Sequence, residues 1–259
     1  MEQRKEKEKS HYENLAKKWR EIHENNNQQS DIENYDINIF SSYRFSKDWL
    51  KQNVKPKMKI LDYGCGHGMH SILPAKLDAK VYAIDFSGES LKIGEQRAKK
   101  EGVENRINFI QMDCEKLNFP DNYFDIIWNG GTLSSLNINK AFLEISRTLK
   151  QNGKIIGIET FGHNPLANLK RWINKKRGIR TPWATNHILK NKDLKLAKRY
   201  FKIEKLNYFH LLSIFVFPFR NFLGGKFLFK LVDKVDNILL KIPFLKKYAF
   251  KIVFIFQKK

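Results

Sequence analysis

The middle of the chain alternates short apolar runs with segments of helical spacing. The apolar runs have the length and composition of buried strands and lie at residues 59–63, 80–85, 106–111, 123–128 and 154–160. Helix-length segments such as 89–100 and 140–149 lie between them. Strands that alternate with helices form right-handed crossovers and a parallel sheet covered on both faces. The pattern therefore predicts a doubly wound α/β domain.

Beyond residue 160 the alternation becomes less regular. Residues 201–209 and 249–256 are candidates for a sixth and a seventh strand, and a long amphipathic segment separates them. That segment comprises an apolar run at 211–219, a break at Gly224-Gly225 and residues 227–242. One helical face of 227–242 carries Leu228, Leu231, Val232, Val235, Ile238, Leu239 and Ile242, and the opposite face carries Lys230, Asp233, Lys234, Asn237 and Lys241. We therefore predict an amphipathic helical insertion near the C-terminus.

The N-terminal region is predicted to be a charged, solvated start followed by two helices. The first ten residues are strongly charged, a helix is expected over 11–24, and a polar loop at 25–30 separates it from a second helix over 40–54. We accordingly divide the chain into N-terminal helices at 1–54, an α/β core at 55–209, a basic insertion at 210–248, and a last strand with its tail at 249–259.

The net charge of +21 is concentrated in the last two-fifths of the chain. Residues 1–160 contain 25 Lys and Arg against 23 Asp and Glu, whereas residues 161–259 contain 23 against 4. Residues 201–259 also hold 12 of the 20 phenylalanines. Basic residues beside an apolar stripe favour an anionic membrane surface over nucleic acid as the partner. A helical cover over the sheet and a dimer contact are the alternative interpretations of residues 211–243.

Composition also indicates the compartment. The opening MEQRKEKEKS has no apolar core of a secretion signal, and the chain has no run of ~18 apolar residues that would predict a spanning helix. Two cysteines are too few for a disulfide framework or a four-thiolate metal site. We therefore expect a cytoplasmic protein, with peripheral contact to the inner face of a membrane.

The clearest local motif is the glycine loop at residues 62–68, Asp-Tyr-Gly-Cys-Gly-His-Gly, which follows the first predicted strand. Gly64 and Gly66 allow the backbone to turn tightly and to approach a ligand. Asp85 ends the second strand, where a carboxylate can accept hydrogen bonds from both ribose hydroxyls. Asp113 follows the third strand, where it can accept from an adenine amino group. The Gly-x-Gly-x-Gly spacing differs from that of dinucleotide sites, so these carboxylates favour a cationic nucleoside.

These segments resemble the class I S-adenosylmethionine-dependent methyltransferases of the type 11-like kind. The resemblance covers roughly residues 55–160 and rests on LDYGCGHG, VYAIDFS, QMDCEKLNFPDNYFDIIWNGGTLSSL and LKQNGKIIGIE. It implies a Rossmann-like fold with a mostly parallel seven-stranded sheet whose last strand is antiparallel, and S-adenosyl-L-methionine as cofactor. It implies cofactor contacts from Asp62, Gly64, Cys65, Gly66, Gly68, Asp85, Phe86, Asp113, Cys114 and Asn129. Family members often fold an N-terminal helix over this pocket, so Tyr12, Trp19 and Tyr43 are lid candidates, with simple packing as the alternative.

A second stretch resembles a bacterial subgroup that carries a Glu-Pro-x-Gly-His-Asn-Pro signature. Residues 159–165 read Glu-Thr-Phe-Gly-His-Asn-Pro, so Thr160 replaces the first proline. Ser134-Ser135 stand where relatives often show paired histidines, and Thr185-Asn186 stand where an acidic pair would be. These departures weaken any acid or base role at those four positions.

Methyl transfer to a hydroxyl needs positioning and a base that accepts the proton. Histidine suits this role near neutral pH. The catalytic candidates are His163, which follows the fifth strand, His187 in the loop beyond it, and Glu159, which is placed to orient a histidine or to bind cofactor. Helix capping is the alternative for His163 and Asn164, and a solvated loop position is the alternative for His187. The candidates for substrate contact are Tyr43, Arg44, Asn164 and Arg180, whose two arginines would hold an anionic group.

We therefore expect an S-adenosylmethionine-dependent methyltransferase that O-methylates a small-molecule, glycan or lipid-linked acceptor at a membrane surface. An RNA methyltransferase that uses the same basic surface is the first rival, although residues 128–131 lack the Asn/Asp-Pro-Pro-aromatic element of base amino-group methylases. The second rival is a regulatory or partner protein that binds the cofactor without turnover.

Overall fold

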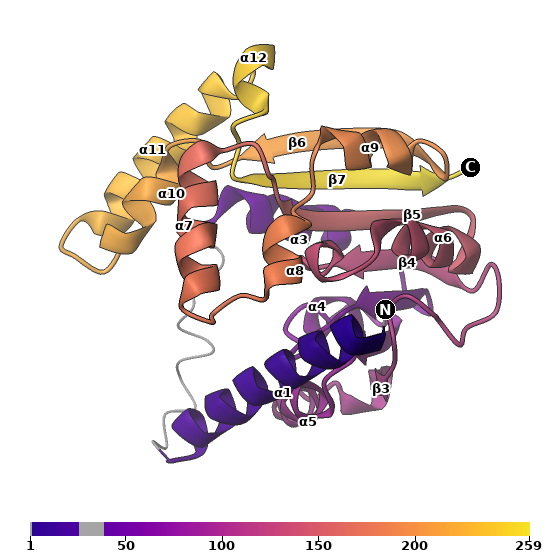
Figure 1. Cartoon of the computed structure of the whole chain (residues 1–259). Helices are drawn as coiled ribbons and strands as arrows, with labels where there is room; N and C mark the ends of the chain where they lie inside the picture. Colours follow the sequence, from indigo (N-terminus) through magenta and orange to yellow (C-terminus); the bar gives the residue numbers. More distant parts are fainter. Residues whose placement is uncertain (1, 26–38) are drawn as a thin grey trace.

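One seven-stranded sheet organises the protein, as seen in a computed structural model that describes residues 2–25 and 39–259 (Figure 1). The strand order is β3-β2-β1-β4-β5-β7-β6. Neighbouring strands from β3 to β5 are parallel, and β7 is antiparallel to both β5 and β6. The strands are Lys59–Tyr63 (β1), Lys80–Asp85 (β2), Ile107–Gln111 (β3), Phe124–Asn129 (β4), Leu149–Thr160 (β5), Phe201–Phe209 (β6) and Lys251–Lys258 (β7). The predicted doubly wound, mostly parallel sheet is confirmed.

Helices cover both faces of this sheet. On one face, α6 (Ile138–Thr148) and α9 (Asn191–Ala197) bury Phe142 and Leu194 in a cluster that includes Ile127 of β4. On the other face, α3 (Ser41–Asn53) buries Trp49 against Ile126 and Trp128 of the same strand. On that second face, α4 (Ile72–Lys76) and α5 (Gly88–Lys100) also pack on β2. Because both faces are covered, the central strands are continuous apolar runs in the sequence.

The strand boundaries differ most from prediction at β5, which begins at Leu149 and not near residue 154. A turn lies within the strand at Asn152-Gly153, where Asn152 has a φ of 61°. The pairing of β4 with β5 accordingly jumps from Phe124–Leu149 to Ile126–Lys154. A bulge therefore accommodates the turn without ending the strand.

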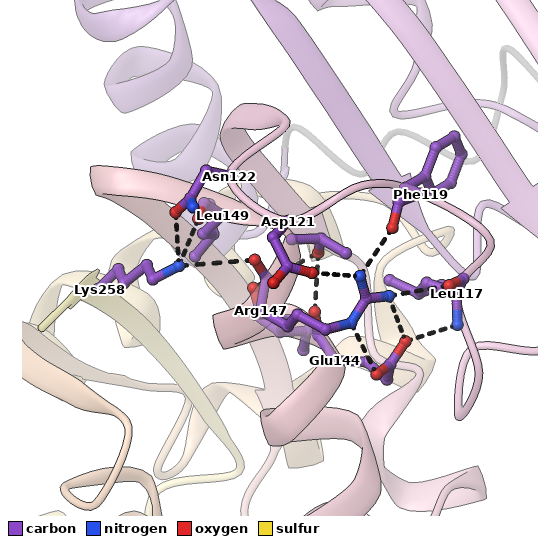
Figure 2. Close-up of polar contacts among 10 residues, drawn as sticks. Leu117, Phe119, Asp121, Asn122, Glu144, Arg147, Leu149 and Lys258 are labelled. Carbon is purple, nitrogen blue, oxygen red and sulfur yellow. Dashed lines mark hydrogen bonds and ion pairs between the residues drawn. The ribbon is translucent and has the colours of Figure 1, made fainter.

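Arg147, at the end of α6, fixes the loop between β3 and β4 (Figure 2). Its guanidinium donates hydrogen bonds of 2.7 or 2.8 Å to the carbonyl oxygens of Phe119 and Leu117 and to the carboxylates of Asp121 and Glu144. In the same view, Lys258 of β7 donates to the carbonyl of Leu149 at 2.8 Å. These contacts hold the segment that starts from Asp113, one of the predicted site residues.

Residues 2–10, for which we predicted only a charged, solvated start, form the first part of α1 (Glu2–Asn25), which runs alongside α5. Several of them are exposed, but Glu8 is buried. Most of the polar loop predicted at 25–30 lies outside the described residues. The remaining elements are α7 (Pro165–Lys176), α8 (Pro182–Asn186), and the 3-10 turns η2 (Glu104–Arg106), η3 (Leu133–Ser135) and η4 (Phe217–Phe219).

The predicted insertion between β6 and β7 is helical. It contains α10 (Ser213–Val216), α11 (Gly225–Leu239) and α12 (Pro243–Lys246). Phe209, Lys251 and Thr160 are neighbours in the register of β6, β7 and β5, so the insertion leaves the sheet at the carboxyl end of β5. Figure 1 shows α10 to α12 projecting beyond that end of the sheet. Across the described residues, no helix is both long and apolar enough to cross a membrane.

Candidate functional site

A cavity of about 200 Å³ lies at the carboxyl ends of β1, β2 and β4, where the strand order reverses. Ligands of open α/β sheets bind at this kind of switch point. The walls come from the glycine loop, the ends of β2 and β3, the loop after β4 and the first turns of α1. Of the ten predicted cofactor residues, the structure brings six to the lining of the cavity: Gly64, Gly66, Asp85, Phe86, Asp113 and Cys114.

The glycine loop depends on backbone conformations and contacts that other residues would disturb. Gly64 has a φ of 70°, and an added Cβ there would lie only 2.3 Å from the Thr132 hydroxyl oxygen. That hydroxyl donates to the Gly64 carbonyl at 3.2 Å, which joins the glycine loop to the loop after β4. Gly66 has a φ of 52°, in the left-handed region that favours glycine. The two glycines therefore allow the glycine loop and the loop after β4 to pack closely against each other.

Asp85 lies at the end of β2 with both carboxylate oxygens engaged by backbone amides. Gly66 N–H donates to Oδ2 at 2.8 Å, and Ser87 N–H donates to Oδ1 at 2.9 Å. Burial raises the pKa of Asp85, while these amide hydrogen bonds act in the opposite direction. Each oxygen keeps a further lone pair, so the carboxylate can accept two more hydrogen bonds, as a ribose diol requires.

Asp113 and Glu115 form an acidic pair on the next wall of the cavity. The Glu115 N–H donates to Asp113 Oδ1 at 2.8 Å, which fixes the turn after β3. The Lys5 ammonium contacts the Asp113 carboxylate and lies 3.4 Å from Glu115 Oε2. Burial lowers the pKa of Lys5, but these carboxylates outweigh that effect and raise it overall. The cavity therefore holds two anionic groups that already have a cationic partner from α1.

The first turns of α1 cover the cavity, and sequence analysis missed most of them. Arg4, Lys5, Glu8 and Lys9 line the cavity together with Tyr12, which was a lid candidate. The Tyr12 hydroxyl is 2.9 Å from the Ser135 hydroxyl. The spacing of apolar residues predicted only the later part of α1. Its first turns are charged and pack through ion pairs, so they show no apolar periodicity. Trp19, a second lid candidate, packs on His67, with ring centroids 4.9 Å apart.

The other four predicted cofactor residues support the cavity from behind and do not line it. Asp62 is buried and accepts a 2.6 Å hydrogen bond from the Ser71 hydroxyl. Burial raises the pKa of Asp62 to about 7. Cys65 is a buried free thiol, as is Cys114, and Gly68 lies against the Phe109 ring. Asn129 is fully buried at the end of β4, where its amide contacts Glu159.

Glu159 holds the loop after β4 in place. Its Oε1 accepts hydrogen bonds of 2.8 Å from the Asn129 side chain and from the Leu133 N–H. Asn129 Oδ1 in turn accepts from the Thr132 N–H at 3.3 Å. Burial raises the pKa of Glu159 to about 7. Gly130, Gly131 and Thr132 line the cavity although Glu159 does not, so its observed contacts are those of a positioning residue.

The two candidate histidines lie outside the lining of this cavity. His163 is half-buried, and its Nε2 accepts from the Asn191 N–H at 3.3 Å. Desolvation, followed by the charges of Lys190 and Lys247, lowers its pKa. His187 is exposed and stacks on Trp183 with ring centroids 3.7 Å apart. A catalytic role for either histidine stays a prediction.

The four predicted substrate residues do not converge on one place. Asn164 caps α7, accepting from the Ala167 N–H at 3.0 Å, in agreement with the capping alternative. Arg44 donates to the Ile39 carbonyl at 2.7 Å, and Arg180 donates to the Ser134 hydroxyl at 3.0 Å. The Tyr43 hydroxyl is 3.1 Å from the Lys251 ammonium.

His70, which sequence analysis did not single out, lies beneath the loop after β4. Its ring stacks on Tyr43 with centroids 5.6 Å apart, and an added Cβ at Gly130 would come within 3.1 Å of it. Desolvation lowers the pKa of His70 to about 3, so the ring is neutral at physiological pH. A neutral, stacked histidine acts here as part of the packing below the cavity wall.

The fold is the Rossmann-like fold of class I methyltransferase domains. Residues 61–157 match the family described as "Methyltransferase domain", and this segment contains the glycine loop, Asp85, Asp113 and Asn129. Residues 61–157 are therefore a methyltransferase domain with the Rossmann-like fold of the S-adenosylmethionine-dependent enzymes.

Two curated relatives each match about half of the chain. The "Ubiquinone/menaquinone biosynthesis C-methyltransferase UbiE" of Shewanella baltica is 33% identical over 133 residues, which cover 48% of this chain and 52% of the relative. The "Demethylmenaquinone methyltransferase" of Geobacillus stearothermophilus is 34% identical over 133 residues, which cover 48% and 56%. The chain thus spans about half the length of the curated relatives that it matches.

A solved structure extends the likeness to most of the chain. Geranyl diphosphate C-methyltransferase from Streptomyces coelicolor, in complex with Mg²⁺, geranyl diphosphate and S-adenosyl-L-homocysteine, has a TM-score of 0.60 to this protein. The match covers 84% of this chain and 79% of the other at 14% sequence identity. At that identity the comparison supports the fold alone.

Proposed function

We propose that this protein is an S-adenosylmethionine-dependent methyltransferase whose cofactor binds in the cavity beneath α1. One observation carries the proposal: Gly64, Gly66, Asp85 and Asp113 line a single cavity within the segment that matches a methyltransferase domain. Asp85 would accept from the ribose hydroxyls and Asp113 from the adenine amino group, while the glycine loop approaches the methionine part. When bound, the cofactor supplies an electrophilic methyl group on a sulfonium. The chain's own task is to hold that group in line with the acceptor.

Calorimetry with S-adenosylmethionine and S-adenosylhomocysteine tests this assignment. We expect Asp85→Asn and Asp113→Asn to weaken binding by about 10- to 100-fold, because each removes a charge-assisted acceptor worth ~1.5–3 kcal/mol. Asp48→Asn changes an exposed carboxylate on α3 and is the matched control. Folded wild-type protein that binds neither nucleoside, or an Asp85→Asn variant with unchanged affinity, would overturn the assignment.

We propose further that the methyl acceptor is an amphipathic molecule, such as a lipid-linked glycan or a quinone-like ring, presented at an anionic membrane surface. The support comes from α11, which packs on the protein through its acidic residues. Asp236 accepts hydrogen bonds of 2.9, 2.8 and 2.9 Å from the N–H groups of residues 211, 212 and 213. Asp233 accepts from the Ser41 hydroxyl at 2.9 Å. Both carboxylates are buried, so this face of α11 is fixed toward the core.

The opposite face of α11 carries apolar side chains into solvent. Its exposed members form one stripe of the helix, with intervals of three or four residues after the adjacent first pair: Phe227, Leu228, Leu231, Val235 and Ile238, continued by Ile242 beyond the end of α11. Phe222, Leu223 and Phe244 are also exposed in the neighbouring turns. The fractional exposures of Phe227 and Ile238 are 74% and 65%. Monomeric soluble proteins rarely expose contiguous apolar patches of this kind unless they serve as an interaction site.

We call this row of side chains the apolar stripe of α11. The charges beside it favour an anionic bilayer as its partner. Lys226, Lys230, Lys234 and Lys241 are exposed on the sector next to it. Residues 210–250 contain 7 Lys and Arg and only 2 Asp, and both Asp residues are buried. Lysine stems beside apolar side chains suit snorkelling toward lipid headgroups, and each basic residue adds ~1 kcal/mol near anionic lipid.

The stripe also belongs to the same edge of the sheet as the cavity. The insertion starts after Phe209 and ends before Lys251, both next to the carboxyl end of β5. The cavity opens at the carboxyl ends of β1, β2 and β4. An acceptor held in a bilayer would therefore approach from the side on which the cofactor is proposed to bind.

Vesicle flotation tests the membrane part of the proposal. We expect wild-type protein to float with vesicles of phosphatidylcholine containing 30% phosphatidylglycerol and not with phosphatidylcholine alone. Substituting Phe227, Leu231 and Ile238 together by Ser, or Lys230, Lys234 and Lys241 together by Gln, should abolish flotation. Gln at Lys51, Lys99 and Lys116 is the matched control, since these exposed lysines lie outside the insertion.

Flotation that is unchanged in both triple variants would refute the proposal that this surface binds the membrane. Wild-type protein that does not float but forms a dimer, which the Ser variants dissociate, would instead assign the apolar stripe of α11 to an interface between copies of the chain. The measurement is flotation followed by sedimentation velocity on the same samples.

Product analysis identifies the atom that receives the methyl group. The sequence favours a hydroxyl, whereas one relative is named a C-methyltransferase. Incubation with methyl-labelled S-adenosylmethionine and a fractionated lipid extract, followed by mass spectrometry, separates O- from C-methyl products. Label that appears only in RNA would favour an RNA methyltransferase, and tight cofactor binding without any product would favour a non-catalytic binder. The cytoplasmic location stays a prediction.

A further inference from the structure

A second cavity, of about 260 Å³, shares none of its lining residues with the first. Its polar lining comes from α7, α8 and the loop that leads to α9: Asn168, Arg171, Thr185, Asn186 and Lys190. These side chains are neutral or cationic, and the described lining includes no carboxylate. The cavity is therefore a basic, hydrogen-bonding space apart from the proposed cofactor site.

Arg171 is the unusual member of this group. Only 5% of it is exposed, yet its guanidinium donates hydrogen bonds to two neutral acceptors, Asn168 Oδ1 at 2.6 Å and the Phe161 carbonyl at 3.1 Å. The guanidinium carbon also lies 5.6 Å from the centroid of the Phe250 ring. Within residues 2–25 and 39–259, no carboxylate forms an ion pair with it. A buried charge is costly unless it is paired, so a buried guanidinium that has no counter-charge among the described residues points to binding of an anion.

The surroundings add positive charge to the cavity. Lys190 lies across Gly162, where an added Cβ would come within 3.0 Å of the Lys190 Cγ and 3.1 Å of its Cε. Desolvation and the nearby charge of Arg180 lower the pKa of Arg171 to about 10, so it still carries its charge at neutral pH. The lowered pKa of His163, caused by desolvation and then by Lys190 and Lys247, reflects the same positive potential.

We propose that this second cavity binds a phosphate-type oxyanion, with Arg171 and Lys190 as its charged donors and the Asn186 amide as a neutral donor. A guanidinium offers paired N–H groups that match two oxygens of a phosphate, and a lysine adds a point charge. A volume of about 260 Å³ accommodates a phosphate or a diphosphate group.

The position of α8 connects this oxyanion site with the methyl acceptor, an inference that rests on the proposed function. Trp183 of α8 lies with its ring 4.6 Å from the guanidinium carbon of Arg4, which lines the first cavity. Thr185 and Asn186 of the same short helix line the second cavity. The same short helix thus contacts Arg4 of the first cavity and lines the second. On this basis the oxyanion would be a phosphate or diphosphate group carried by the acceptor.

Calorimetry with inorganic phosphate and with pyrophosphate at low ionic strength tests the site. We expect wild-type protein to bind pyrophosphate and Arg171→Gln and Lys190→Gln each to weaken that binding at least tenfold, with Arg171→Lys intermediate. Arg177→Gln, an exposed arginine just after α7, is the matched control and should stay within twofold. Wild-type protein that does not bind pyrophosphate, or an unchanged affinity in Arg171→Gln, would overturn the proposal.

Two further measurements keep the outcome interpretable. Binding of S-adenosylhomocysteine by the same variants should be unchanged, which shows that they are folded and separates failure of this site from failure of the proposed function. Decyl phosphate should bind at least tenfold more tightly than inorganic phosphate, and decanol should not compete with pyrophosphate. Equal affinities for decyl phosphate and inorganic phosphate would assign the site to free phosphate and would overturn its link to an amphipathic acceptor.

Discussion

The ammonium group of Lys5 contacts the carboxylate of Asp113, the group to which we assign the adenine amino group of the cofactor. Arg4 makes the equivalent contact with Glu115. The first turn of α1 therefore places its own cations on acceptors that a nucleoside would use. Farther along, Glu13 accepts hydrogen bonds from the first N–H groups of α5, at 2.8 Å from Gly88. α1 is therefore attached to the core at a second place, which does not depend on the first turn.

We predict that Lys5→Ala strengthens binding of S-adenosylhomocysteine by about three- to tenfold. The substitution removes a partly buried ion pair, worth ~1 kcal/mol, that the ligand would otherwise have to displace. Calorimetry provides the affinity, and Lys18→Ala, an exposed lysine on the same helix, provides the control. Weaker binding by Lys5→Ala would mean that the lysine contacts the ligand instead of competing with it.

Burial of Asp62 predicts a specific pH dependence of stability. Its pKa is raised to about 7 by burial, so the folded protein binds a proton that the unfolded chain releases near pH 4. This contribution to the free energy of unfolding is therefore complete below about pH 4 and is lost as the pH rises through 7.

Asp62→Asn keeps an acceptor for the Ser71 hydroxyl but carries no charge at any pH. We expect the variant to exceed the wild type in free energy of unfolding by roughly 2–4 kcal/mol at pH 8, with a smaller difference at pH 5. Urea unfolding at the two pH values measures this, with Asp48→Asn as an exposed control. Parallel pH profiles of wild type and Asp62→Asn would contradict the buried-carboxylate explanation.

The sequence patterns correctly predicted the sheet, and six of the ten predicted cofactor residues line the cavity, for physical reasons that can be named. β1 and β2 have the predicted bounds because their burial makes apolar runs that end sharply. β6 also has the predicted bounds, with a buried phenylalanine at each end. Asp85 and Asp113 line the cavity because strand ends of a parallel sheet meet at one edge. Asp62 and Asn129 also lie at strand ends, but they are held behind the cavity wall by Ser71 and Glu159. Whether a strand-end side chain faces the cavity therefore depends on its hydrogen-bond partners elsewhere in the sequence, and a local motif does not reveal these partners.

The same limit applies to the helices at the two ends of the described chain. Charged residues such as Lys5 look solvated in the sequence, but Asp113 lies 108 positions away and pairs with it. The apolar periodicity of α11 predicts a stripe without predicting its direction. Asp233 and Asp236 turn the stripe outward, because their acceptors find donors in residues 41 and 211–213.

Glu159 provides a test that separates positioning from contact with the ligand. We predict that Glu159→Ala weakens binding of S-adenosylhomocysteine at least tenfold, because the Asn129 amide and the Leu133 N–H lose their acceptor and the loop between them loses its anchor. Glu159→Gln keeps an oxygen for both donors and should bind within threefold of the wild type. Calorimetry and thermal melting measure both variants. A loss in Glu159→Gln as large as in Glu159→Ala would show that the carboxylate charge itself contacts the ligand.

Asp236 should control both the local stability of the insertion and its orientation. Its carboxylate accepts three backbone N–H bonds in a fully buried position, so Asp236→Ala leaves three amides without a partner. The cost is on the order of 2–4 kcal/mol, since an unsatisfied buried donor is expensive. We expect faster hydrogen exchange at residues 211–213 and earlier cleavage of 217–248 in limited proteolysis.

The same variant should lose flotation with anionic vesicles, although every residue of the apolar stripe of α11 is retained. The physical reason is that the stripe faces outward only while Asp236 and Asp233 hold the other face of α11 against the core. Asp236→Asn keeps one acceptor oxygen and should be intermediate in both assays, whereas Asp48→Ala should match the wild type. Full protection from exchange together with normal flotation in Asp236→Ala would show that the buried carboxylate does not set the direction of the helix.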